Sequence, residues 1–126
     1  MSQEACGIII INESLWRRAM LHPADRLIAE ELKNRLIAAG IPLEELRVYG
    51  SRARGDHDPE SDLDVCLILR EHTPAIDASI SRTAWEVGFA HERIIMTVEF
   101  TLDQIQQSPL RISPFLHAIE AEGVMV

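Results

Sequence analysis

Two short apolar runs flank a polar stretch near the middle of the chain, and the residues at their facing ends constrain the fold most. One run ends at Gly50 and Ser51, and Asp62 and Asp64 open the next run after residues 52–61. Both runs have the length of short strands, and the stretch between them contains glycine, proline and several aspartates, which favour a turn and loop. The spacing predicts a phosphate cradle that faces a pair of metal-binding carboxylates.

The segments around this motif predict a small α/β (α+β) domain. Apolar periodicity and end signals such as Pro23, Gly40 and Gly123 predict helices over residues 23–39, 75–91 and 114–122, a helical turn over 103–107, and strands over 46–49, 62–69 and 94–101. This order predicts a small mixed β-sheet packed with helices. Within the 75–91 helix, Trp85 and Phe89 are expected to pack against the sheet.

Residues 1–22 are interpreted as an N-terminal extension of uncertain structure, with a candidate strand over 8–11 and a candidate helix over 13–21. The domain itself is expected to span residues 23–126. With 126 residues, the chain is long enough for one hydrophobic core but not for a second independent module.

Composition excludes several classes of function. The formal net charge of -8 argues against direct binding to nucleic acid, because acidic groups repel a phosphate backbone. No apolar run is long enough to span a bilayer, so no membrane association is expected. Cys6 and Cys66 lie far apart in the sequence and form no metal-ligand cluster, which indicates free thiols in a reducing cytoplasm.

The carboxylates predict a magnesium site. Residues two apart in a strand share a face, so Asp62 and Asp64 project together and need a neutralising cation. Magnesium is commonly held by one or two carboxylates together with substrate phosphates. Glu99, on the polar face of the next strand, is the candidate third carboxylate, and Asp103 takes its place if the sheet register differs. Three such groups can hold two divalent ions.

The Gly-Ser pair predicts the nucleotide-binding half of the site. Gly50 can adopt backbone conformations that let the chain approach a phosphate closely, and Ser51 offers a hydroxyl and a backbone N–H. Arg52 and Arg54 are candidates to neutralise a polyphosphate, and Arg54, directly before Gly55, is the stronger of the two.

With these residues in place, the segment YGSRARGDHDPESDLDVCLIL resembles the signature of the DNA polymerase beta-like nucleotidyltransferase superfamily. Over about residues 23–123 the chain resembles its minimal (MNT-type) members. The resemblance implies that Gly50 and Ser51 hold the nucleotide triphosphate, that Asp62 and Asp64 bind metal, and that Arg54 is the arginine of the turn. The third carboxylate of that superfamily is most often Asp, whereas this chain offers Glu99.

The resemblance also implies a reaction and a partner. Larger relatives carry a helical acceptor-binding domain for which this chain has no counterpart, so the acceptor is expected on another protein. Many minimal nucleotidyltransferases pair with a HEPN-type ribonuclease toxin. By resemblance, this chain is an antitoxin that transfers AMP from ATP to a tyrosine hydroxyl of the toxin, with Mg²⁺ as cofactor, in a hetero-oligomer. An acidic antitoxin facing a more basic ribonuclease is electrostatically favourable.

Three other functions stay open at the level of sequence. The presence of Glu99 where the superfamily most often has Asp is compatible with a non-catalytic antitoxin that acts by binding alone. The second alternative is a nucleotidyltransferase that modifies a small molecule such as an antibiotic. The third is a nucleotide-sensing module that binds ATP without turnover.

Overall fold

The structure, a computed structural model, describes residues 21–54, 62–107 and 114–126. The candidate strand over residues 8–11, nearly all of the candidate helix over 13–21, and residues 55–61 of the motif loop lie outside this description. The elements, in chain order, are α3 (Pro23–Ala38), β1 (Leu43–Tyr49), α4 (Ser51–Arg54), β2 (Leu63–Leu69), α5 (Pro74–Ala90), β3 (Ile95–Thr101), α6 (Leu102–Gln107), α7 (Pro114–Glu122) and β4 (Val124–Met125).

The sheet is mixed, which confirms the predicted fold class. Its strands lie in the order β3-β2-β1-β4. β1 is antiparallel to both β2 and β4, whereas β2 and β3 are parallel. A parallel pair needs a long crossover between its strands, and α5 provides it.

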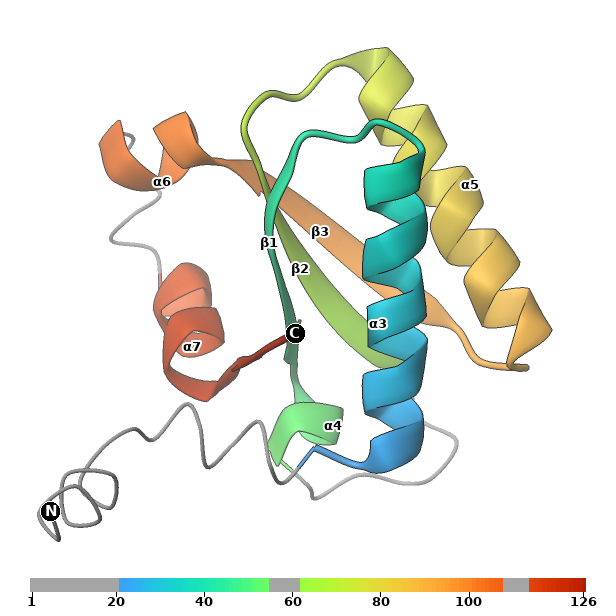
Figure 1. The fold of residues 1–126 in the computed structure, drawn as a ribbon. Coiled ribbons are helices and arrows are strands. Elements are labelled where there is room, and N and C mark those ends of the chain that lie inside the picture. Colours follow the sequence, from blue (N-terminus) through green and yellow to red (C-terminus); the bar gives the residue numbers. More distant parts are fainter. Residues whose placement is uncertain (1–20, 55–61, 108–113) are drawn as a thin grey trace, which may run out of the picture.

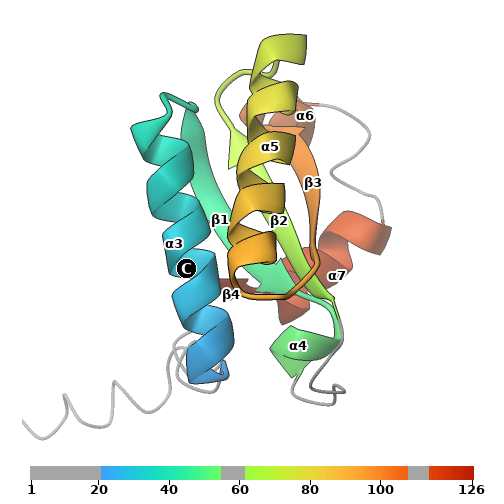
Figure 2. The same ribbon diagram turned by 90° about the vertical axis from the view of Figure 1, so that its right-hand side faces the viewer.

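Helices cover both faces of this sheet. α3 and α5 lie side by side over one face, and α6 and α7 lie on the other (Figures 1 and 2). Because β2 is central, its side chains are buried on both faces. One face belongs to the main core, whose members include Ile28, Leu32, Leu36, Leu63, Val65, Leu67, Ile80 and Val87. On the other face Cys66 and Ile68 pack against Ile119 of α7.

The ends of the two long helices follow from local sequence. The Nδ1 atom of His22 accepts a hydrogen bond from the Ala24 N–H at the start of α3, and Pro23 occupies the first turn. Thr73 caps α5 in the usual way, since its hydroxyl oxygen accepts from the Ile76 N–H. Gly40, with φ +85°, ends the α3 segment in the left-handed region that glycine tolerates best.

Several features of the fold differ from the sequence prediction, among them α4, which begins a stretch expected to be turn and loop, and the start of β1 at Leu43. Trp85 and Phe89 do not pack against the sheet, because they are 65% and 71% exposed and stack on each other with ring centroids 5.1 Å apart. β4 was not predicted, since a strand of two residues leaves no periodicity to detect. No helix within the described ranges has the length and apolar character needed to cross a membrane.

Candidate active site

The two halves of the motif meet at one end of the sheet. Tyr49, the last residue of β1, pairs with Asp64 near the start of β2. Gly50 follows directly with φ +79°. A Cβ atom at this position would lie 2.6 Å from Oδ2 of Asp64, which is closer than non-bonded atoms approach. Two observations therefore favour glycine at position 50. Its positive φ suits a residue without a side chain, and a Cβ atom would crowd the Asp64 carboxylate.

Asp62 and Asp64 are near enough for their charges to interact. Asp64 is half-buried on β2, and Asp62 is exposed just before the strand begins. Burial raises the pKa of Asp64, and the neighbouring charge of Asp62 raises it further. Among the described residues, none donates a hydrogen bond to either carboxylate or forms an ion pair with it. A partly desolvated pair of like charges without a cationic partner in the described ranges fits a divalent cation.

Tyr49 lies beside Asp64 at this site, and the sequence analysis assigned it no role. Its ring packs edge-on against Phe115 of α7, with centroids 5.8 Å apart. Burial raises the pKa of its hydroxyl, and the charges of Asp64 and Cys66 add to the rise. Its place as the last strand residue before Gly50 is the sequence feature that could have indicated a position at the site.

Arg52 lies in a buried ion pair with Asp25, whereas the sequence analysis expected it to contact the nucleotide. Its guanidinium is 4% exposed and donates to both carboxylate oxygens of Asp25 in α3, at 2.7 and 2.8 Å. Arg93, just before β3, also donates to Asp25, at 3.0 Å. Burial alone would raise the pKa of Asp25, but the two arginines outweigh it and hold that pKa below its usual value. Arg52 is committed to this buried network, which joins α4 to α3.

The structure leaves the other two residues of the turn untested. Ser51 and Arg54 begin and end α4, so their backbone lies directly beyond Gly50. Their side chains lie outside the described part of the chain. Phosphate binding by Ser51 and Arg54 therefore stays a prediction.

Glu99 is not the third carboxylate beside Asp62 and Asp64. In the parallel β2–β3 pair, Asp64 lies opposite Met96 and Glu99 lies opposite Leu67. Paired residues share a face and successive residues alternate, so Glu99 projects from the face opposite to Asp64. It also lies three residues farther along the sheet, roughly 10 Å at 3.3 Å per residue. Asp103, the alternative, falls still farther away in α6, beyond the opposite end of β3.

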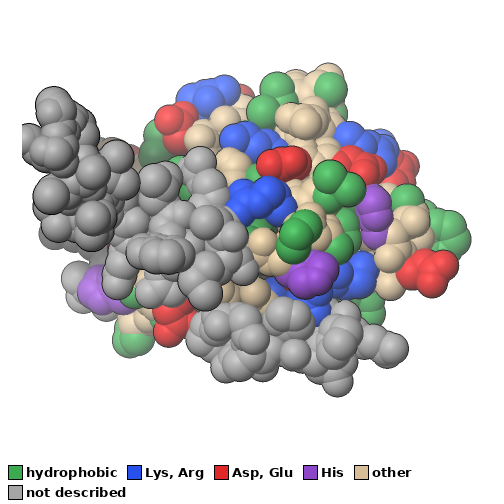
Figure 3. Space-filling view, turned by 60° about the horizontal axis from the view of Figure 1, so that its bottom comes forward, with side chains coloured by type: hydrophobic (Ala, Val, Ile, Leu, Met, Phe, Trp, Pro, Cys, Tyr) green, Lys and Arg blue, Asp and Glu red, His purple; other side chains and the backbone are tan. Residues whose placement is uncertain are grey.

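Met96, rather than Glu99, is the β3 residue that lies opposite Asp64. It pairs with Asp64 and is 51% exposed. The described ranges therefore place two acidic side chains, Asp62 and Asp64, at this end of the sheet beside Gly50. Figure 3 views the molecule from this end, and acidic, basic, histidine and hydrophobic side chains share the visible face.

Comparison with known proteins identifies this arrangement. The family model described as nucleotidyltransferase domain matches residues 26–121. That range includes Gly50, Asp62 and Asp64. Such a domain implies a nucleotide substrate and a divalent metal. No functionally curated protein shows significant sequence similarity to the chain.

Solved structures share the fold at low sequence identity. A candidate nucleotidyltransferase from Sulfolobus solfataricus superposes with a TM-score of 0.51 at 18% identity, and the match covers 94% of this chain and 90% of that one. A mutant of the toxin–antitoxin complex MntA–HepT gives 0.51 at 18% identity, covering 77% and 70%. A toxin–antitoxin structure with AMP-PNP gives 0.51 at 16% identity, covering 76% and 70%.

Proposed function

The chain belongs to the nucleotidyltransferase domain family, and from that membership we propose that it transfers AMP from ATP to a hydroxyl group of a partner protein. The observation that carries the proposal is the junction of Gly50 with Asp64. The missing side chain of Gly50 leaves the space that the Asp64 carboxylate occupies, and this proximity supports a single site made of the Gly-Ser turn and the acidic pair. This is the juxtaposition that a nucleoside triphosphate with its metal requires.

In this proposal, Asp62 and Asp64 hold magnesium, up to two ions. Bound there, magnesium would neutralise the triphosphate and stabilise the charge that develops as pyrophosphate leaves. Asp62 and Asp64 would orient the nucleotide through that metal. The metal would also offset the repulsion between the two carboxylates. Because Glu99 lies on the other face of the sheet, it has no part in deprotonating the acceptor.

We assign the phosphate contacts to the turn after β1. Gly50 allows the backbone to approach the triphosphate closely, and Ser51 and Arg54 would supply a hydroxyl and a positive charge. Arg52 has a positioning role. Its buried pair with Asp25 fixes α4 against α3, which holds the turn in place behind Gly50.

A partner protein is the proposed acceptor. Two structures with a similar fold are toxin–antitoxin complexes, and one of them contains the ATP analogue AMP-PNP. Together with the resemblance of residues 49–69 to minimal nucleotidyltransferases, these matches support a HEPN-type ribonuclease as the partner and an antitoxin role for this chain. The formal net charge of -8 suits a basic partner surface.

The test is intact-mass spectrometry of the candidate toxin after incubation with this chain, Mg²⁺ and ATP. We expect a mass gain of one or more AMP units. The gain should disappear with the Asp62→Asn/Asp64→Asn double variant. Asp103→Asn is the matched control, because it removes an exposed carboxylate of α6, away from the site, and should leave transfer unchanged. Equal transfer by the double variant and the wild type would refute the mechanism.

Met96 favours a second candidate, a non-catalytic antitoxin that neutralises its partner by binding alone. The β3 residue opposite Asp64 carries a thioether and Glu99 lies on the other face, so the described part of β3 adds no third carboxylate beside Asp62 and Asp64. This candidate requires a stable complex without a mass gain, and full neutralisation by the double variant. A mass gain on neither protein and no complex would direct the search to small-molecule acceptors.

A further inference from the structure

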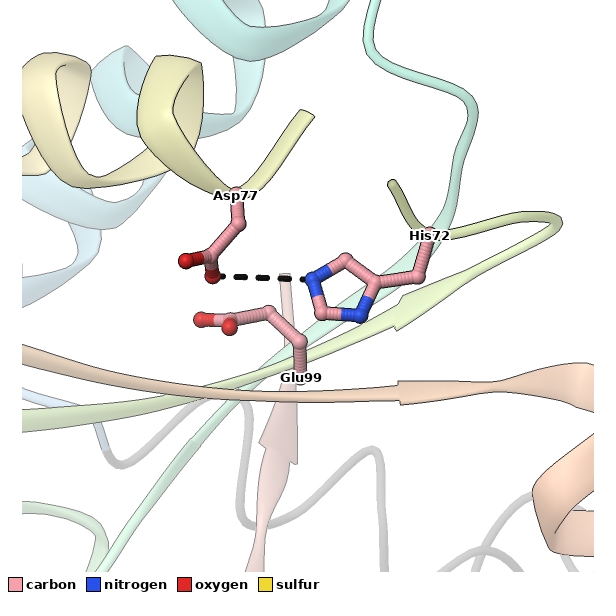
Figure 4. Close-up of side chains that lie close together, drawn as sticks. All are labelled: His72, Asp77 and Glu99. Atoms are coloured by element: carbon pink, nitrogen blue, oxygen red, sulfur yellow. Dashed lines mark ion pairs between the residues drawn. The ribbon is translucent and has the colours of Figure 1, made fainter. Parts of the chain in front are cut away.

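A second group of potential metal ligands lies near the opposite end of the sheet. His72 is in the loop after β2, Asp77 is in the first turn of α5, and Glu99 projects from β3 towards both (Figure 4). One ligand atom from each of the three residues lies within 4.8 Å of the other two. Asp64 is near the start of β2 and on the other face, so this group is distinct from the candidate active site.

One of the three separations in this group matches that between two ligands of a small tetrahedral ion. Nε2 of His72 lies 3.5 Å from Oδ1 of Asp77. Nitrogen and oxygen ligands bound at about 2.0–2.1 Å in a tetrahedral arrangement lie about 3.4 Å from each other. The three side chains also come from three different segments, so they approach the shared space from different directions, as a metal site requires.

The charges point to a cation as well. The carboxyl groups of Asp77 and Glu99 lie close enough to share a hydrogen bond, so two acidic groups occupy the same small space. No lysine or arginine of the described ranges pairs with Asp77 or Glu99. Two adjacent carboxylates repel each other, and a divalent cation bound between them would remove that repulsion.

We propose that His72, Asp77 and Glu99 form a binding site for a divalent transition-metal ion, with Zn²⁺ the best fit. One imidazole and two carboxylates make a nitrogen–oxygen set that zinc accepts, whereas magnesium prefers oxygen ligands alone. Three protein ligands leave a fourth position for water or an external group. The ion would link the loop after β2 and the start of α5 to β3, and thereby strengthen the α5 face of the sheet.

The experiment is equilibrium dialysis with Zn²⁺ on the full chain carrying Asp62→Asn/Asp64→Asn, which removes competing metal binding at the active site. We expect one zinc ion per chain. Adding Asp77→Asn or Glu99→Gln should weaken zinc binding by more than about 100-fold, because even the loss of outer-shell partners of a metal site weakens affinity about 10–100-fold. His72→Gln should weaken it by a similar factor.

Asp103→Asn is again the matched control, since Asp103 is also an exposed aspartate in the first turn of a helix. It should leave zinc binding unchanged. Thermal unfolding gives an independent readout, because zinc should raise the Tm of the double variant but not after Asp77→Asn is added. Zinc binding that is absent in the double variant, or that survives Asp77→Asn and Glu99→Gln, would overturn the proposal. Neither result depends on nucleotidyl transfer.

Discussion

At the scale of single residues, the burial of Asp64 sets the electrostatics of the candidate active site. A carboxyl group whose pKa is raised in the folded state binds its proton more tightly there than in the unfolded chain. Its contribution to stability is therefore present at low pH and is lost as the pH rises through the folded-state pKa. At neutral pH, the ionised Asp62–Asp64 pair destabilises the metal-free protein.

Replacing Asp64 with Asn should therefore abolish transfer and also raise the Tm of the metal-free protein at pH 7. The difference in Tm between Asp64→Asn and the wild type should shrink as the pH falls below about 4, because the Asp64 carboxyl group then becomes protonated in the unfolded as well as the folded state. Mg²⁺ should raise the Tm of the wild type and not that of Asp64→Asn. Thermal unfolding followed by circular dichroism across this pH range tests the prediction. A lower Tm for Asp64→Asn at pH 7 would contradict it.

At the scale of elements, one buried carboxylate holds three segments together. Asp25 in α3 binds Arg52 of α4 and Arg93 before β3, and both its carboxylate oxygens are engaged. Since the pKa of Asp25 is lowered in the folded state, its stabilising contribution is present above the unfolded-state pKa. It is lost as the pH falls through the folded-state pKa.

Asp25→Asn should cost about 3–5 kcal/mol of unfolding free energy, because it removes one member of a buried ion-pair network that involves Arg52 and Arg93. Urea unfolding at pH 7 measures this loss. The control is Glu86→Gln, which breaks the exposed pair with Arg35 and should cost only about 0–1 kcal/mol. Similar losses in the two variants would show that the Asp25 network is not the stronger link.

The exposed aromatic pair of α5 gives a second prediction for an element. Trp85→Ala should change the unfolding free energy by only about 0.5 kcal/mol, as is usual for surface positions. Ile80→Ala on the same helix should cost about 2–5 kcal/mol, since Ile80 is fully buried. Comparison of the two variants by urea unfolding separates these outcomes. A large loss at Trp85 would mean that the ring packs in the core after all.

At the scale of the whole molecule, the C-terminal segment completes the sheet. Val124 of β4 pairs with Val48 of β1 and is fully buried in the main core. Nζ of Lys33, in α3, donates to the Val126 carbonyl at 2.9 Å. The last strand is thus attached both to β1, which leads into the Gly50 turn, and to the helix that covers it.

Val124→Ala should lower the unfolding free energy by about 2 kcal/mol, because roughly 0.8 kcal/mol is lost per buried CH₂ and a small cavity adds to this. The same substitution at the half-buried Val126 should cost less. Urea unfolding of the two variants provides the comparison, and an equal or larger loss at Val126 would contradict the role assigned to β4.

The sequence by itself predicted most of the helices and strands and the position of Gly50 beside the acidic pair. Helix periodicity and Pro23 mark the long helices, an apolar run marks β2 and apolar alternation marks β3, because these signals act within a few residues of the chain. The conjunction of Gly50 with Asp64 was predictable for the same reason. Strands that flank a single connection bring their facing ends together.

Only the tertiary structure decided what depends on distant segments. The alternation along β3 shows that Met96 and Glu99 face opposite ways, but the register against β2 decides which of them shares a face with Asp64. The burial of Arg52 likewise required Asp25, which lies in a different element. The exposure of Trp85 depends on how α5 is rotated over the sheet. Register, helix rotation and long-range ion pairs leave no local pattern in the sequence, because the groups that fix them meet only when the chain is folded.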